Sequence, residues 1–451
     1  MKKQRLTVIS FSLILLALLG GLILCSGEES LAAEPGNELS LGSRGEEVGM
    51  IQKSLAGAGY YPEDAPSEYF GLTTLTAVLA FEKASGLPAD GVIGDIERQL
   101  LMSKGSPEGG ESVSGAGPEQ SGSEDAQPGF SQSKLKRTVL GYYTEYYPGD
   151  NLSYNSLSAN HASIDSIATF SYLTDGRGNL TGTPITNGVE LAKNKKVKSL
   201  MLVHNINDAI DSDAAHTLLS VRENRLNFEK NILSLIEEHG FDGVNIDLEG
   251  VPAVDRSNYS TLLKELKAML KPAGYLLTVS IPAKTRDNPL DNWNGAYDYA
   301  AIGEYADMVT LMTYDEHWAG GYPGPVASLS WVQQVLDYAV KSIPRGKILM
   351  GVAAYGYNWS SAGGCSTVLW NKADALASRN GGARWSDQYS APYLIYYDQR
   401  GYRHEVWFEN RFSLALKLDL ANRYDLAGIA VWRLGFEDYS FWQTVAEKFS
   451  K

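Results

Sequence analysis

The chain has 451 residues, of which 44% are hydrophobic, and a formal net charge of −14. This length suggests two or three domains with ordinary globular cores. The acidic balance excludes ordinary nucleic-acid binding, because the phosphate backbone would repel the chain. With only two cysteines, and histidines that lack metal-ligand spacing, we expect no disulfide framework, no metal site and no cofactor.

The first 33 residues have the pattern of an export signal. Three basic residues among the first five positions precede an apolar run from Leu6 to Cys25, and Ser30-Leu31-Ala32 offers a small-x-small cleavage site. The apolar run is also long enough to span a bilayer, so an uncleaved membrane anchor is the alternative. In both cases we expect the mature chain to act outside the cytoplasm, secreted or at the cell wall, with membrane contact only if the signal is retained.

Residues 38–102 are predicted to form a small helical unit. Val48, Ile51 and Leu55 share one helical face, a second helix follows over Leu75–Phe81, and a third short one follows Gly94. The unit contains no cluster of catalytic residue types. Its turns and helix starts resemble the peptidoglycan-binding domain of bacterial wall enzymes, through Leu41-Gly42-Ser43-Arg44-Gly45-Glu46-Glu47-Val48, Ile51-Gln52-x-x-Leu55, Gly59-Tyr60, Ala77-Val78-x-x-Phe81 and Gly86-Leu87-x-x-Asp90-Gly91-Val92-Ile93-Gly94.

This resemblance has two departures, Glu82 in place of the usual Gln and Asp95-Ile96-Glu97 in place of Pro-x-Thr. They bear on ligand affinity more than on the fold. A generic three-helix bundle with another partner is the alternative interpretation.

Residues 103–136 are rich in Gly, Ser, Pro and Glu and nearly free of large apolar residues. Such a segment cannot bury enough surface to offset its ordering entropy, so it is predicted to be a flexible tether.

Residues 137–451 alternate short apolar strands with amphipathic helices, which predicts parallel βαβ units and a (β/α)8 TIM barrel. The stretch from Asn358 to Phe412 breaks the alternation and is predicted to be an insertion between the seventh and eighth strands. The predicted strands are Val139–Tyr143, Ile167–Tyr172, Ser199–His204, Gly243–Leu248, Leu276–Ile281, Met308–Met312, Ile348–Ala353 and Gly428–Trp432.

The fourth of these strands carries the clearest chemical signal. Side chains alternate faces along a strand, so Asn245, Asp247 and Glu249 should all point into the barrel. Polar groups are costly there unless they are paired or used, and Glu249 is placed at the C-terminal rim, where barrel enzymes hold their catalytic groups. Asp247 and Glu249 should not both ionise freely, which leaves one carboxyl protonated near neutral pH as a general acid. A chance acidic strand end is the alternative.

The stretch Asp242-Gly243-Val244-Asn245-Ile246-Asp247-Leu248-Glu249 resembles the Asp-x-x-Asp-x-Asp-x-Glu signature of glycoside hydrolase family 18, which includes chitinases and endo-β-N-acetylglucosaminidases. The resemblance extends to Gly141-Tyr142-Tyr143, Phe170-Ser171-Tyr172, Met312-Thr313-Tyr314-Asp315 and Trp432. It implies that Glu249 is the acid, that Asp247 and Tyr314 hold the substrate acetamido group, and that Trp432 forms the floor of the −1 sugar site. It further implies that Met312 and Asp315 line this subsite, with Tyr142 and Phe170 nearby.

The resemblance also implies substrate-assisted catalysis with retention, in which the acetamido oxygen attacks the anomeric carbon. One departure is Asn245, where the family usually has Asp. We expect Asn245 to donate to Asp247 and to let it ionise more readily. Together with the domain that resembles a peptidoglycan-binding domain, the Val244-Asn245-Ile246-Asp247 motif resembles the branch of family 18 that acts on peptidoglycan, including spore-cortex enzymes.

We therefore expect a monomeric peptidoglycan N-acetylglucosaminidase that cleaves β-1,4 bonds. A chitinase with chitin-like substrates is the alternative within the same chemistry, and a non-catalytic lectin-like wall protein is the alternative outside it. Other tryptophans, among them Trp318 and Trp331, are candidates for sugar stacking, although Trp is as often a core residue. His204 and Asn205, at the end of the third strand, are weaker candidates for substrate contact.

Overall fold

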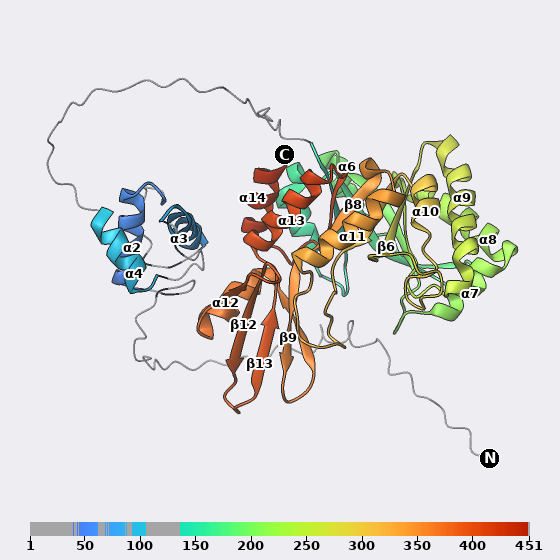
Figure 1. The fold of residues 1–451 in the computed structure, drawn as a ribbon. Coiled ribbons are helices and arrows are strands. Elements are labelled where there is room, and N and C mark those ends of the chain that lie inside the picture. The colour runs from blue at the N-terminus through green and yellow to red at the C-terminus, as the bar shows by residue number, and fades with distance from the viewer. Residues whose placement is uncertain are drawn as a thin grey trace, which may run out of the picture. The chain divides into compact units, whose positions relative to one another are not determined.

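The computed structural model of the protein describes residues 45–61, 72–85, 93–104 and 136–449, together with residues 39, 43, 68, 70 and 87. The predicted export signal and most of the predicted tether lie outside these residues. The chain divides into two compact units, which are described separately (Figure 1). Within the described ranges, no helix has the length and apolar character that a membrane span requires.

The small unit is helical, as predicted. Val48, Ile51 and Leu55 on the first helix are buried together with Val78 and Phe81 on the second. A single bridge joins Leu39 to Ile93 just before the third helix. The helices are α2 (Glu46–Gly57), α3 (Leu72–Ser85) and α4 (Asp95–Lys104).

The large unit is a closed barrel of eight parallel strands, which confirms the predicted fold class. Each strand pairs with its neighbours in sequence order, and the pairing of the first strand with both the second and the last closes the barrel. The barrel strands are β1 (Thr138–Tyr143), β2 (Ser166–Thr174), β4 (Lys198–His204), β5 (Gly243–Asp247), β6 (Leu276–Pro282), β7 (Met308–Met312), β8 (Ile348–Ala353) and β14 (Gly428–Trp432).

Helices surround the barrel, and their apolar faces pack against the strands (Figure 1). Helix α9, for example, buries Leu262, Leu263, Leu266 and Leu270 along one face. A short strand, β3 (Leu180–Gly182), pairs antiparallel with the end of β2. The helices are α5 (Leu152–Asn160), α6 (Thr186–Lys195), α7 (Ser212–Ser220), α8 (Arg222–His239), α9 (Arg256–Leu270), α10 (Tyr299–Tyr305), α11 (Leu329–Ser342), α13 (Arg411–Arg423) and α14 (Tyr439–Lys448), with short 3-10 turns at His161–Ser163, Ala253–Asp255, Lys271–Ala273 and Arg345–Lys347.

The predicted insertion between the seventh and eighth barrel strands is a second sheet that extends from the barrel (Figure 1). Its predicted edges are wrong by a few residues at each end. The first strand starts at Tyr355, because the alternating run after Ala353 continues directly into it, and Arg411 and Phe412 already belong to α13. The insertion comprises β9 (Tyr355–Ser360), β10 (Cys365–Leu369), α12 (Trp370–Arg379), β11 (Arg384–Ser386), β12 (Ala391–Tyr397) and β13 (Arg403–Trp407).

Candidate active site

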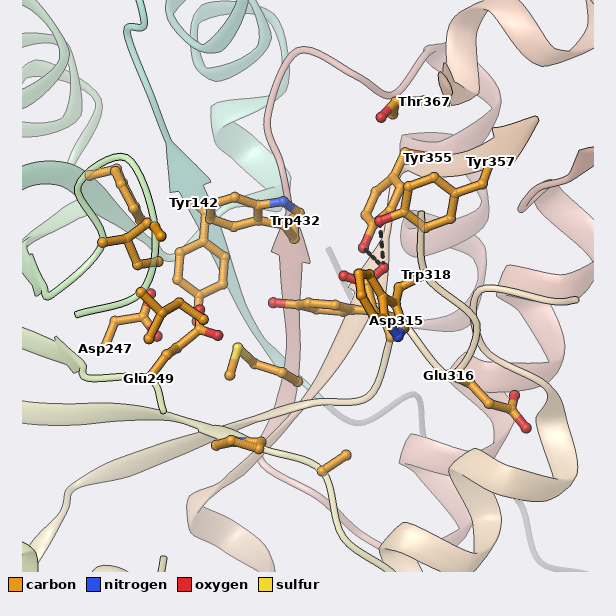
Figure 2. A pocket seen from close by; sticks show the side chains of 18 of the residues that line it. Tyr142, Asp247, Glu249, Asp315, Glu316, Trp318, Tyr355, Tyr357, Thr367 and Trp432 are labelled. Carbon is orange, nitrogen blue, oxygen red and sulfur yellow. Dashed lines mark hydrogen bonds between the residues drawn. The ribbon is translucent and has the colours of Figure 1, made fainter. Parts of the chain in front are cut away.

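A cleft of about 550 Å³ opens at the C-terminal ends of the barrel strands. Its walls come from segments far apart in the sequence, which the closed barrel brings to one rim. Eight of the nine predicted site residues line it: Tyr142, Phe170, Asp247, Glu249, Met312, Tyr314, Asp315 and Trp432. Figure 2 shows Asp247 and Glu249 side by side, close to Tyr142.

The carboxyl pair lies at the end of β5. The strand ends at Asp247 rather than Leu248, so Glu249 lies just beyond its last hydrogen-bonded residue. Burial, and then the nearby Asp315 carboxylate, raise the pKa of Glu249 to about 7. Burial, and then the Glu249 carboxylate, raise the pKa of Asp247 well above its usual range. At neutral pH this pair therefore retains a proton that Glu249 is placed to deliver into the cleft.

Asn245 is the ninth of these residues and does not line the cleft. It is fully buried below Asp247. Its Nδ2 donates to Thr278 Oγ1 at 2.9 Å, and its Oδ1 accepts from Ser280 Oγ at 2.9 Å. The expected hydrogen bond from Asn245 to Asp247 is wrong: the amide oxygen and one amide N–H bond to the neighbouring strand β6 instead.

The carboxyl of Asp247 lies in a different environment from the amide of Asn245. Its Oδ1 is buried and has no hydrogen-bond partner within the part of the chain that the structure describes. An anionic oxygen without a donor is strongly disfavoured in a buried position. Asp247 therefore resists ionisation until a donor approaches this oxygen. That Asn245 lets Asp247 ionise more readily than an Asp at the same position would stays a prediction.

Asp315 is fixed by two tyrosines of the insertion. The hydroxyls of Tyr355 and Tyr357 donate to Asp315 Oδ1 at 2.6 and 2.9 Å (Figure 2). Asp315 itself adopts a left-handed backbone conformation with φ of 60°, which is unusual for a residue with a side chain. Burial raises the pKa of Asp315, and the two tyrosine hydrogen bonds oppose that rise.

Trp432 is held between aromatic edges. The Tyr142 and Phe170 rings meet it at centroid distances of 5.2 and 5.9 Å with interplanar angles of 62° and 68°. Phe170 stacks in turn on His204 at 4.1 Å. Such edge-to-face contacts fix the orientation of the indole at the wall of the cleft.

Tyr314 contributes a hydroxyl that stays protonated. Burial, together with nearby acidic groups, raises its pKa well above its usual range, so it remains a donor at every working pH. The ring passes close to β8 at Gly351, where an added Cβ would lie 2.8 Å from Tyr314 Cε1. A glycine at this position therefore leaves room for the tyrosine.

Several lining residues were not predicted. Tyr355 and Tyr357 come from the insertion, and the loop after β4 contributes residues 206–210. Of the other tryptophans, Trp293, Trp318 and Trp331 line the cleft, whereas Trp359, Trp370, Trp407 and Trp442 are buried in the core. His204 and Asn205 lie behind the wall and do not line it. The described residues contain no cluster of side chains suited to hold a metal ion.

A (β/α)8 barrel with a buried carboxyl pair of raised pKa and aromatic side chains at its C-terminal rim has the layout of a glycoside hydrolase. The chain belongs to the glycosyl hydrolases family 18, whose model matches residues 138–437. The peptidoglycan binding domain family matches residues 44–101, in the small unit.

Relatives are found among bacterial glycosylases. The chain is 35% identical over 322 residues to the uncharacterized glycosylase YvbX of Bacillus subtilis, covering 70% of this chain and 94% of the relative. Among solved structures, the spore cortex-lytic enzyme SleL of Bacillus megaterium superposes with a TM-score of 0.67 at 28% identity, covering 71% of this chain and 75% of that one. A chitinase from Chromobacterium violaceum superposes with a TM-score of 0.66 at 32% identity, covering 70% and 99%.

Proposed function

We propose that the protein is a retaining N-acetylglucosaminidase that cleaves β-1,4 bonds of peptidoglycan by substrate-assisted catalysis. The observation that carries the mechanism is the buried Asp247 oxygen without a donor, beside Glu249 with its raised pKa. An acetamido N–H is a donor of the kind that this oxygen lacks. The Tyr314 hydroxyl, which stays protonated, can donate to the acetamido oxygen.

The chemistry then takes two steps. Glu249 gives its proton to the glycosidic oxygen while the acetamido oxygen of the −1 sugar bonds to the anomeric carbon, and the bond to the leaving sugar breaks. Asp247 accepts a hydrogen bond from the acetamido nitrogen and stabilises the resulting cation. In the second step the Glu249 carboxylate takes a proton from water, the water oxygen bonds to the anomeric carbon, and the cyclic intermediate opens. Two displacements from opposite faces retain the β configuration.

The choice of peptidoglycan rests on the small unit, which matches a peptidoglycan binding family. It also rests on the similarity of the barrel to a spore cortex-lytic enzyme. The similarity to a chitinase over nearly all of that enzyme favours chitin-like glycans as the second candidate substrate. We also propose that residues 1–33 export the chain and that it acts as a monomer at the wall. Fractionation of a culture into medium, wall and membrane, with size-exclusion of the mature chain, tests these two points.

The products identify the bond that is cut. A lactyl substituent next to the acetamido group would crowd the −1 site over Trp432, and misplacement near the reacting centre is costly. N-acetylglucosamine should therefore occupy −1 and form the new reducing end. Borohydride reduction and hydrolysis of digested peptidoglycan should yield glucosaminitol, and proton NMR of fresh product should show the β anomer first. Dominant muramitol, or an initial α anomer, would contradict the proposal.

A further inference from the structure

The backbone of Glu249 lies beyond the end of the barrel ladder. Strand β5 pairs with β4 as far as the partners His204 and Asp247, and with β6 only as far as Ile246. The chain then turns at Gly250, whose φ is +60°. Something other than the strand pairing must therefore fix the peptide groups of Glu249.

Asn205, the residue that follows β4, supplies these contacts. Its Oδ1 accepts from the backbone N–H of Glu249 at 2.8 Å, and its Nδ2 donates to the backbone carbonyl of Glu249 at 2.8 Å. Asn205 is fully buried. A side-chain amide offers the same donor and acceptor as a peptide group, so this two-way contact continues the β4–β5 ladder past the end of both strands.

The same amide also closes the loop that forms one wall of the cleft. Asn205 Nδ2 donates to the Asp211 carbonyl at 3.0 Å, and the Asp211 N–H donates back to the Asn205 carbonyl at 2.9 Å. Between these ends, residues 206–210 line the cleft. Gly250 packs against this loop so closely that an added Cβ would lie 2.7 Å from Ile210 Cγ2.

We propose that Asn205 is a positioning residue that sets the orientation of Glu249 and joins the cleft-wall loop 206–210 to it as one rigid unit. Asn205 does not line the cleft and acts through the backbone of Glu249. The inference rests on the proposed role of Glu249 as the acid. A displacement of about 1 Å at a reacting group is enough to cost about 10²-fold in rate, so a clamp on its backbone has a measurable kinetic effect.

Asn205→Asp and Asn205→Ala test the proposal in the full chain. Asp keeps the shape of Asn and can accept a hydrogen bond from the Glu249 N–H. It places a carboxylate oxygen next to the carbonyls of Glu249 and Asp211, which lose their donor, and it adds a negative charge near the Glu249 carboxyl. On soluble oligomers of alternating N-acetylglucosamine and N-acetylmuramic acid, we expect kcat to fall by roughly 10- to 100-fold in both variants with KM changed less than about threefold. In Asn205→Asp alone, the basic limb of the pH profile should move to higher pH, because the added charge raises the pKa of Glu249.

Asn422→Ala is the matched control. Asn422 also bonds the backbone through its amide, donating to the Lys448 carbonyl at 3.1 Å, and its Oδ1 accepts from Arg137 just before β1, at the opposite end of the barrel. Its loss should lower the Tm and leave kcat and the pH limbs unchanged. If kcat falls less than about threefold in every Asn205 variant that folds, and the basic limb stays in place, Asn205 is only structural and the proposal is overturned. Asn205→Ser serves where Asn205→Asp does not fold.

Glu249→Gln separates this inference from the proposed function. An active Glu249→Gln enzyme would overturn the assignment of the acid itself. An inactive Glu249→Gln enzyme beside fully active Asn205 variants would overturn the positioning role alone.

Discussion

Two side chains two residues apart on β5 are treated in opposite ways by their surroundings. Asn245 is satisfied on both sides by Thr278 and Ser280, and the Ser280 hydroxyl also meets the Tyr142 hydroxyl at 2.7 Å. Asp247, next in line toward the cleft, keeps a buried oxygen without a partner in the described chain. Two successive inward-facing residues of β5 therefore differ: the amide of Asn245 is hydrogen-bonded, and one carboxyl oxygen of Asp247 is not.

The difference separates what holds the site from what reacts in it. A satisfied buried network is rigid and gives the strand a fixed position. An unsatisfied buried acceptor costs free energy of folding, and it persists where a ligand can supply the missing donor. The hydrogen-bond network around Asn245 thus supports the site, whereas Asp247 and Glu249 can still bond to a substrate.

The largest effect on activity should come from replacing the proposed acid, Glu249. Glu249→Gln should lower kcat by roughly 10²–10⁴-fold, because the leaving oxygen loses its acid. The variant should also be more stable than the wild type at pH 8, by thermal melting. The folded pKa of about 7 lies above the ordinary value, so the wild type loses stability as the pH rises through 7 and the amide does not.

The stability gap should close as the pH falls toward 4, where the wild-type carboxyl is protonated in both states. Near-wild-type turnover with normal melting would refute the assignment of the acid. Loss of activity with a gap that does not depend on pH would instead refute the raised pKa.

A smaller effect on activity should follow from replacing Asn245, whose amide is hydrogen-bonded, by an acidic residue. Asn245→Asp places a third buried carboxyl below Asp247 and Glu249, and like charges raise one another's pKa. Both limbs of the pH–kcat profile should move to higher pH. The Tm should fall progressively between about pH 5 and 8, because ionising the new carboxyl destabilises the folded state.

Asn245→Leu is the control for this change. It removes the amide and leaves Thr278 and Ser280 without it, but it adds no charge. It should lower the Tm equally at every pH. Identical pH profiles for the Leu and Asp variants would show that a charge at position 245 does not change the pKa values of Asp247 and Glu249.

A still smaller effect should come from the insertion. Tyr355→Phe combined with Tyr357→Phe removes the hydrogen bonds that keep the pKa of Asp315 from rising further. Asp315 would then be protonated more often, its charge would no longer raise the pKa of Glu249, and the basic limb should move to lower pH.

Tyr396→Phe provides the control for the tyrosine pair. Its hydroxyl accepts from Asn358 at 3.2 Å elsewhere in the same sheet, outside the cleft lining. It should leave the limb in place. A basic limb that does not move in the double variant would show that the Asp315 charge does not act on Glu249.

The sequence predicted the parts of the site that depend on local periodicity. Alternation along one strand was enough to place Asp247 and Glu249 on the inner face, and the barrel then carried them to the rim. Tyr314, Asp315 and Trp432 were predicted by resemblance and line the same cleft. The eight strands were recognisable because each is a short apolar run between helices.

The failures concern contacts set by tertiary structure. The partners of Asn245 depend on the register between β5 and β6, which no local pattern encodes. Tyr355 and Tyr357 alternate along β9 with the period of a strand, but their target, Asp315, lies forty residues earlier. Asn205 gave the weak signal of a polar residue after a barrel strand, and its contact with Glu249 is visible only in three dimensions.

The smallest effect on soluble substrate should come from deleting residues 38–102. The small unit has its own buried core around Val48, Leu55 and Phe81, and the residues that line the cleft in the described part of the chain belong to the barrel unit. Turnover of soluble glycan oligomers should therefore stay unchanged.

On insoluble sacculi, binding by the small unit should raise the local concentration of the tethered barrel, so its loss should lower the rate by about tenfold or more at low enzyme concentration. The difference should vanish when the enzyme saturates the wall, because tethering then adds nothing. Pull-down of the intact and truncated chains with purified sacculi, followed by measurement of reducing-sugar release, checks both halves of the expectation. Equal binding and digestion by the truncated chain would show that the small unit has a partner other than the wall glycan.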